Sequence, residues 1–233
     1  MRLRVNTMSS LIQTKNIGRK FNPDGSVRFF PGNTIISKVK PENSIYPVIT
    51  KISDAFREAD TARKYAFLPF SSLHMTMIQG VCDEDRKETL WSRYLPLDLP
   101  LPQVDDFFEE KYKAVEALPE THMVFDTIDI SGATILVRFK PETAKDAENL
   151  KRFRDDVSEK LGVRFPDHDS YGFHISVAYL LWELDEKERA AIEETCRKLE
   201  EPLKAQRPVF TLRQPDMTYF KDMMYFSGER IAR

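Results

Sequence analysis

Apolar residues follow two different spacings along the first half of the chain, and each spacing predicts a type of element. Residues 34–39 are rich in β-branched side chains, and residues 73–79 alternate apolar and polar positions, so both stretches predict strands. Between them, residues 44–66 predict a helix whose apolar side chains recur three and four positions apart, at Ile49, Ile52, Phe56 and Ala59. The charged stretch 83–118 is interrupted by prolines, which predict short helices and loops.

The second half of the chain repeats this order. Residues 122–130 and 134–139 predict a hairpin that turns at Ser131–Gly132, and residues 142–161 predict an amphipathic helix. The remaining expected elements are a strand at 173–181, a helix at 185–206 and strands near 209–212 and 217–226. Strand–helix–strand therefore occurs twice, about 100 residues apart, which predicts an α+β fold of two lobes that share one interface.

The N-terminal part of the chain stands outside this repeat. Residues 1–15 show no periodicity and are expected to form a flexible segment. Residues 21–30 carry Pro-Asp-Gly between apolar ends, which predicts a β-hairpin. Because no Gly/Ser-rich linker separates the two halves, we expect residues 16–233 to form a single bilobal domain.

Composition narrows the class of protein. With 41% hydrophobic and 31% charged residues in 233, the chain is too apolar to be disordered, and its apolar runs are too short to span a membrane. The net charge of −2 does not call for long nucleic acid as a partner. The two cysteines, Cys82 and Cys196, are far apart and favour a reducing compartment. Together with an N-terminus that lacks a signal peptide's apolar middle, this predicts a cytoplasmic protein, and we expect a monomer.

Two of the four histidines occupy matching positions in predicted strands. The stretches Leu-His-Met-Thr-Met and Phe-His-Ile-Ser-Val place His74 two residues before Thr76, and His174 two residues before Ser176. Side chains on a strand alternate between its faces, so each histidine shares a face with its hydroxyl while the apolar residues point the other way. Each strand is thus expected to present a His and a hydroxyl in front and to pack against helices behind.

This pairing suits chemistry at a phosphodiester. Imidazole accepts or donates a proton near neutral pH, and a nearby hydroxyl can hydrogen-bond a phosphate oxygen. If the two repeats face one another, a phosphate between them meets a base on one side and an acid on the other. The pattern therefore predicts cleavage or formation of a phosphodiester without a metal or other cofactor, with His74, Thr76, His174 and Ser176 as the catalytic residues.

In these motifs the chain resembles the 2H phosphoesterase superfamily, the group of LigT-like RNA 2′,3′-cyclic phosphodiesterases and 2′-5′ RNA ligase-like proteins, and within it a bacterial-type branch. The two His-x-Thr/Ser motifs carry the resemblance, which extends over residues 30–228. It implies a pseudo-twofold α+β fold in which two antiparallel sheets enclose a central cleft, with helices outside. It also implies metal-independent phosphodiester chemistry with one histidine as base and the other as acid, on a nucleotide 2′,3′-cyclic phosphate or a related cyclic phosphodiester.

Further residues add candidates of secondary rank. Tyr171 precedes the second motif and is expected to stack on a base or bind phosphate, and Arg138 is placed to supply positive charge to the cleft. The Asp-His-Asp run around His168 suggests a metal site, but adjacent side chains in one loop rarely converge on one ion. We therefore expect no metal.

Two other functions remain open at this stage. The same four side chains could serve a non-catalytic module that binds a nucleotide or an RNA end. The chemistry could also run in reverse, as a 2′-5′ RNA ligase-like activity, which would require RNA ends as partners. A small nucleotide or cyclic phosphate is the expected substrate.

Overall fold

The sheet organises the molecule, and all of its pairings are antiparallel. The structure is a computed structural model that describes residues 12–230. Its strand order is β7-β4-β5-β6-β3-β1-β8-β9, with β2 also paired to β6. The strands are β1 (Gly32–Lys38), β2 (Tyr65–Phe67), β3 (His74–Cys82), β4 (Thr121–Asp129), β5 (Thr134–Pro141), β6 (His174–Leu180), β7 (Val209–Leu212), β8 (Asp216–Asp222) and β9 (Tyr225–Ser227).

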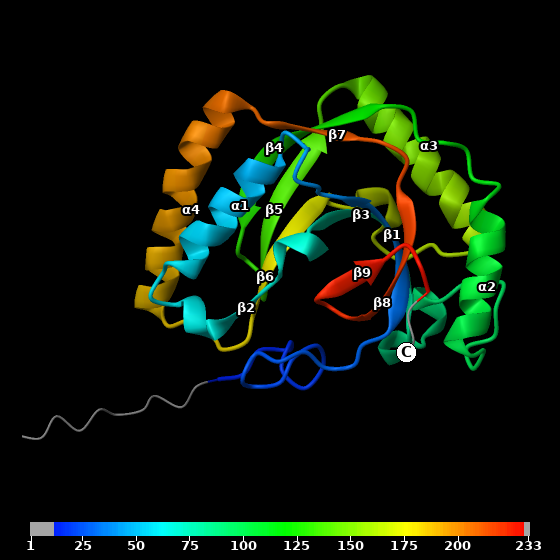
Figure 1. Ribbon diagram of the computed structural model, residues 1–233, viewed down its shortest axis with the longest axis horizontal. Coiled ribbons are helices and arrows are strands. Elements are labelled where there is room, and N and C mark those ends of the chain that lie inside the picture. The colour runs from blue at the N-terminus through cyan, green and yellow to red at the C-terminus, as the bar shows by residue number, and fades with distance from the viewer. Residues whose placement is uncertain (1–11, 231–233) are drawn as a thin grey trace, which may run out of the picture.

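Within residues 12–230, four α-helices lie outside this strongly curled sheet. They are α1 (Tyr46–Arg57), α2 (Leu101–Tyr112), α3 (Ala144–Leu161) and α4 (Glu186–Gln206). Helices α1 and α4 lie together on one side, and α2 and α3 lie together on the other (Figure 1). Mixed helices and antiparallel strands confirm the predicted α+β class. None of the helices within residues 12–230 is both long and apolar enough to cross a membrane.

The expectation of two separate sheets is wrong in one respect, because the two halves form one continuous sheet. The central strands β3 and β6 meet through the pair Met75–Ile175. Further along β6, the strand β2 takes over the same edge, with Tyr65 opposite Leu180. The two central strands therefore diverge after their first residues, and the short β2 satisfies the backbone groups that this divergence leaves open.

The internal repeat is visible in the strand register. In the first half Lys38 lies opposite His74 and Ile36 opposite Thr76, with an irregularity between Ile35 and Ile36. In the second half Arg138 lies opposite His174 and Leu136 opposite Ser176, with an irregularity between Ile135 and Leu136. Equivalent positions differ by 100 in residue number, so the two halves share one local geometry.

Capping residues set the bounds of the second-half helices. Thr143 and Asp146 form a capping box at the start of α3, and Gly162 ends the helix in the left-handed conformation with φ 73°. A second capping box, of Asp185 and Glu188, begins α4. These local signals explain why the predicted bounds of both helices agree with the observed ones to within two residues.

The first-half helix is shorter than predicted, which corrects the expected range 44–66. Helix α1 ends at Arg57, and residues 65–67 form β2 instead. Periodic apolar spacing continues past Arg57 to Ala59, but pairing with the exposed edge of β6 makes an extended conformation more favourable for 65–67. Tertiary pairing therefore overrides the local helical pattern there.

The N-terminal segment packs against the end of the sheet. Most of the segment expected to be flexible, residues 1–11, lies outside the described residues. Within the described part, Gln13 forms a bridge with Trp182, and the buried Thr14 donates a backbone hydrogen bond to Leu181. The hairpin expected at 21–30 is a tight turn with one β-bridge, between Phe21 and Val27, and without regular strands. Backbone hydrogen bonds from Asn22 to Ser26 and from Arg28 to Lys20 also hold it.

Candidate active site

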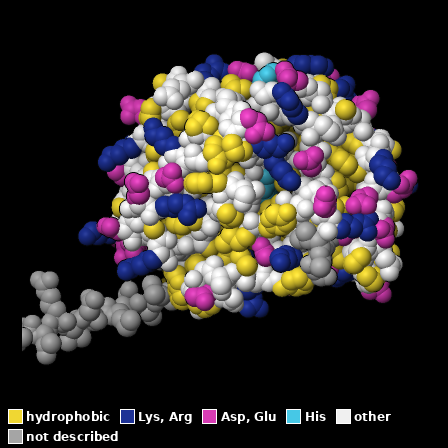
Figure 2. Space-filling model, viewed as in Figure 1, with side chains coloured by type: hydrophobic (Ala, Val, Ile, Leu, Met, Phe, Trp, Pro, Cys, Tyr) yellow, Lys and Arg dark blue, Asp and Glu magenta, His cyan; other side chains and the backbone are white. Residues whose placement is uncertain are grey.

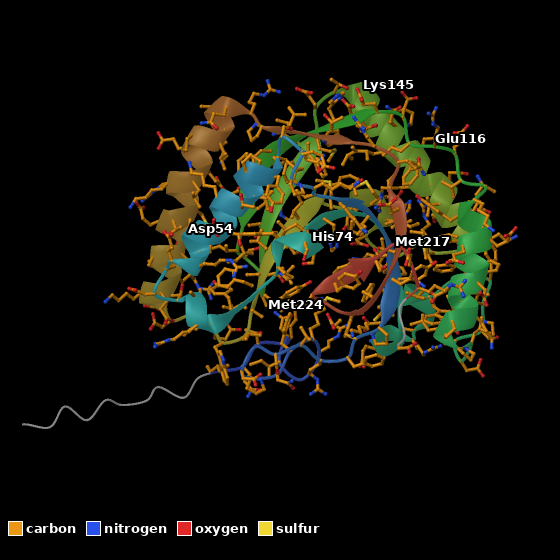
Figure 3. All side chains as sticks on the ribbon, viewed as in Figure 1. Asp54, His74, Glu116, Lys145, Met217 and Met224 are labelled. Carbon is orange, nitrogen blue, oxygen red and sulfur yellow. The ribbon has the colours of Figure 1, made fainter. Side chains whose placement is uncertain are left out.

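The two motif strands bring the predicted histidines and hydroxyls onto one face of the sheet. Met75 and Ile175, which pair directly, are both fully buried in the main core. Because antiparallel neighbours alternate around such a pair, His74 is placed opposite Ser176, and Thr76 is placed opposite His174. These four side chains are half-buried and share the face opposite the core. In Figure 3, His74 lies near the centre of the molecule, with Met224 below it.

Both imidazole rings are held in the same tautomer by the same local hydrogen bond. His74 Nδ1 lies 2.7 Å from the carbonyl oxygen of Ser72, and His174 Nδ1 lies 2.7 Å from that of Gly172. A carbonyl oxygen only accepts, so each Nδ1 carries the hydrogen and donates it. Each Nε2 is therefore the atom that accepts or delivers a proton, and the hydrogen bond fixes the orientation of the ring.

A positively charged side chain lies beside each histidine. Lys38 and Arg138 lie directly opposite His74 and His174 on the neighbouring strands, so each pair of side chains shares a face. Arg138 is held by Asp129, which accepts a hydrogen bond of 2.7 Å from its Nε and also pairs with its Nη2. Figure 2 shows a histidine in the middle of this face with basic side chains next to it.

Lys38 was missed by the sequence reasoning, although a signal for it existed. It ends its strand at the position equivalent to Arg138, 100 residues earlier. In contrast to Arg138, the Lys38 ammonium forms no ion pair within residues 12–230. Its charge is thus available to an anion bound at His74.

Burial and positive charge lower the pKa of both histidines. Burial is the main cause for His74, whose pKa falls to about 4, and the charges of His174 and Lys38 lower it further. For His174, burial again lowers the pKa most, and Arg138 adds to the effect, whereas the bond to Gly172 and the charge of Asp129 oppose it. In the ligand-free protein both rings are neutral at pH 7, and His74 is the harder of the two to protonate.

Tyr171 lies between the two motifs. Its ring centroid is 6.0 Å from that of His174, and its hydroxyl shares a hydrogen bond with Thr76. The guanidinium of the buried Arg154 stacks on the Tyr171 ring at 4.5 Å. Burial raises the pKa of Tyr171 to about 12, so its hydroxyl stays protonated. All six residues singled out from the sequence are thus on or beside one surface.

Phe226 lies closer to His74 than Tyr171 lies to His174. The ring centroids of Phe226 and His74 are 4.3 Å apart, at an angle of 53°. Phe226 comes from β9, which the β8–β9 turn folds back toward the motif strands (Figure 1). No local pattern around residue 226 indicates this contact, because it depends on how distant strands are placed.

The other residues considered from the sequence, the run around His168 and the two cysteines, take part in structural contacts. His168 Nε2 lies 3.0 Å from Asp155 Oδ1, and Arg164 binds both Asp155 and Asp169. Within the described residues, Asp155, His168 and Asp169 form one group with ligand atoms within 4.8 Å of one another. Arg164 already pairs with both carboxylates of this group. These residues therefore form an ion-pair network that anchors the loop before β6. Burial raises the pKa of Cys82 and Cys196 to about 12, so neither is a reactive thiolate.

Comparison with known proteins gives one family match and several similar structures. Residues 20–134 match a family model named 2H-phosphodiest, a domain of unknown function (DUF1868). The match covers about half of the chain and includes the first histidine motif, and it supports the resemblance to the 2H phosphoesterase superfamily that the two motifs indicated. No curated protein matches the chain.

Three solved structures are similar to this chain to different degrees, and the first has a similar overall fold. The crystal structure of the conserved protein of unknown function ATU0111 from Agrobacterium tumefaciens is 29% identical, covers 92% of this chain and 91% of that chain, and has a TM-score of 0.85. TT0787 of Thermus thermophilus is 12% identical, with 81% and 85% of the two chains covered and a TM-score of 0.43. Kluyveromyces marxianus Usb1 with uridine monophosphate is 12% identical, with 82% and 93% covered and a TM-score of 0.41.

Proposed function

We propose that this protein is a metal-independent phosphodiesterase that opens a nucleoside 2′,3′-cyclic phosphate or a closely related cyclic phosphodiester. The observation that carries the proposal is the matched pair of histidines. Each ring donates from Nδ1 to a carbonyl two residues earlier and keeps Nε2 for proton transfer. Both rings lie on one face of two neighbouring strands, with a hydroxyl and a cation beside each.

The reaction requires one base and one acid on opposite sides of phosphorus. One Nε2 removes a proton from water, and the water oxygen forms a bond to phosphorus. The bond from phosphorus to the 2′ or 3′ oxygen breaks, and that oxygen takes the proton carried by the other Nε2. The product is a ribose phosphomonoester, and each proton transfer typically contributes about 10²–10⁴-fold to the rate.

The surrounding residues stabilise the negative charge of the transition state. Thr76 and Ser176 are placed to donate hydrogen bonds to the non-bridging oxygens, as in other sites with preorganised donors. Lys38 and Arg138 add positive charge from the two flanking strands. Asp129 acts through Arg138 by holding its guanidinium, so it is a positioning residue.

Catalysis needs one ring neutral and the other protonated. A bound phosphate anion favours protonation of the adjacent rings, which offsets the lowered pKa values of the ligand-free protein. The two pKa values that limit the reaction belong to the coupled pair. Because the pKa of each histidine lies below its usual 6.5, kcat/KM should peak at a pH below about 6.5.

Turnover by the full chain tests the proposal. The protein, treated with a chelator, is incubated with each of the four nucleoside 2′,3′-cyclic phosphates, and products are followed by phosphorus NMR. We expect the wild type to open at least one of them, and His122→Ala, a histidine outside the site, to retain this activity. Saturable binding without product from any substrate would contradict the proposal and support a nucleotide-binding module instead.

A further inference from the structure

The two histidines have equivalent local geometry but different surroundings. A cavity of about 320 Å³ opens beside His74 and Thr76 and is not lined by His174 or Ser176. This volume is at the lower end of the range of small-molecule sites, which is about 300–1,000 Å³. The asymmetry indicates that the substrate is itself asymmetric, with a bulky group on the His74 side.

Aromatic side chains form one part of the walls of this cavity, and polar residues form another. Phe226 lies at the His74 end, and Phe220 packs against it with ring centroids 5.1 Å apart. Phe30 and Tyr179 line the cavity as well. Phe30 comes from the N-terminal segment and Phe226 from the C-terminal hairpin, so parts of the chain outside the internal repeat build the cavity. Such walls favour a planar, aromatic ligand group.

Two polar groups in the cavity have no charged partner within residues 12–230. The Lys20 ammonium lies 4.6 Å from the Tyr179 ring centroid and 5.5 Å from that of Phe30, and it donates one long hydrogen bond, of 3.5 Å, to the Tyr179 hydroxyl, which leaves its other hydrogens for a ligand. The Gln79 side chain is exposed and forms no hydrogen bond with another described residue.

Arg19, Asp85 and Asn33 also line the cavity, and all three already have partners. Arg19 is paired with Asp85. Asn33 donates to Asp105 and accepts from the backbone of Val81. A ligand edge that carries both donors and acceptors would therefore meet Gln79 and Lys20 rather than these groups.

We propose that this cavity binds the base of a nucleotide whose phosphate lies at His74 and Thr76, a conclusion that rests on the function proposed above. The base stacks between the aromatic walls, and its polar edge bonds to Gln79 and Lys20. The ribose then lies on the His74 side of the phosphate, so the leaving oxygen faces His74 and the attacking water faces His174. His74 thus delivers the proton to the leaving oxygen, and His174 removes the proton from water. Because His74 is the harder of the two rings to protonate in the ligand-free protein, this assignment requires the bound phosphate anion to raise the pKa of His74.

Equilibrium binding tests the cavity independently of turnover. Calorimetric titration of the full chain compares a nucleoside 3′-monophosphate with ribose 5-phosphate, which has no base. We expect the nucleotide to bind at least about tenfold more tightly, since stacking of one base on aromatic side chains contributes that much or more. Lys20→Met and Gln79→Ala should each weaken nucleotide binding severalfold and leave ribose 5-phosphate unaffected.

Matched variants and contrasting outcomes make this experiment decisive. Lys15→Met and Gln103→Ala change exposed residues of the same types outside the cavity and should have no effect. Equal affinity for the nucleotide and ribose 5-phosphate would overturn the proposal, as would equal losses for both ligands in the two variants. Because no turnover is involved, these results are separate from failure of the phosphodiesterase activity.

The orientation of the nucleotide has its own test. In a cyclic phosphorothiolate, sulfur replaces the leaving oxygen, and a thiolate with a conjugate pKa near about 8.5 leaves without a general acid. His74→Ala should therefore be far more active on the sulfur substrate than on the oxygen substrate, whereas His174→Ala should be inactive on both. Recovery by sulfur in His174→Ala instead would overturn the orientation.

Discussion

Replacing Phe226 by alanine should raise the pKa of His74. The Phe226 ring lies 4.3 Å from the His74 ring and shields it from water. Burial is the largest cause of the fall of this pKa from 6.5 to about 4. The difference of about 2.5 units corresponds to about 3 kcal/mol in favour of the neutral ring. Alanine would admit water to one side of the imidazole and partly restore the solvation of the charged form.

We expect Phe226→Ala to raise the pKa of His74 by about one unit, which equals about 1.4 kcal/mol. At pH 5 the neutral fraction of His74 would then fall from about nine-tenths to about half. The acidic limb of kcat/KM should move upward by the same unit, because that limb reports the second protonation of the histidine pair.

An NMR titration of the imidazole signals measures the pKa directly, with the His74 signals identified by their absence in His74→Gln. Tyr225→Ala is the matched control, because Tyr225 belongs to the same short strand but its side chain is 53% exposed. A pKa in Phe226→Ala within about 0.3 units of the wild type would refute the reasoning, and so would an equal rise in Tyr225→Ala.

Two further predictions concern stability and phosphate binding. The pKa of His74 is lower in the folded state than in the unfolded state, so the unfolded chain binds more protons between pH 4 and 6.5. The free energy of unfolding should therefore fall by up to about 3 kcal/mol as the pH drops through that window. Urea denaturation should show a shallower fall in His74→Gln, and an identical slope would contradict this origin. Calorimetry should show that Lys38→Met weakens the binding of inorganic phosphate about tenfold. The control Lys40→Met changes an exposed lysine nearby and should not weaken it. Equal effects of the two variants would exclude a specific role for Lys38.

The core of the candidate site could be predicted because it depends on local alternation and on a repeat. His74 and Thr76 fall on one face of a strand by period two, and the second motif shows the same pattern 100 residues later. Arg138 follows from the same alternation on the preceding strand. Lys38 could have been found by applying the repeat to Arg138, since the register places both next to a histidine.

Features that depend on long-range packing could not be predicted in this way. Phe226 reaches His74 only because β9 folds back across the sheet. The strand β2 forms because β6 leaves an edge open where it diverges from β3, and no pattern within residues 65–67 distinguishes it from a continued helix. The strand pair Met75–Ile175 joins the two expected sheets into one, and this pairing is also a long-range contact.

A double-mutant cycle on the two histidines tests the central claim most directly. The kcat/KM of the wild type, His74→Ala, His174→Ala and the double variant is measured in a chelator on the nucleoside 2′,3′-cyclic phosphate that is opened fastest. Residues that act as one acid–base unit should each lower kcat/KM by about 10²–10⁴-fold, and the double variant should be no slower than the worse single variant. Full activity in either single variant, or loss of wild-type activity in the chelator, would contradict the two-histidine mechanism.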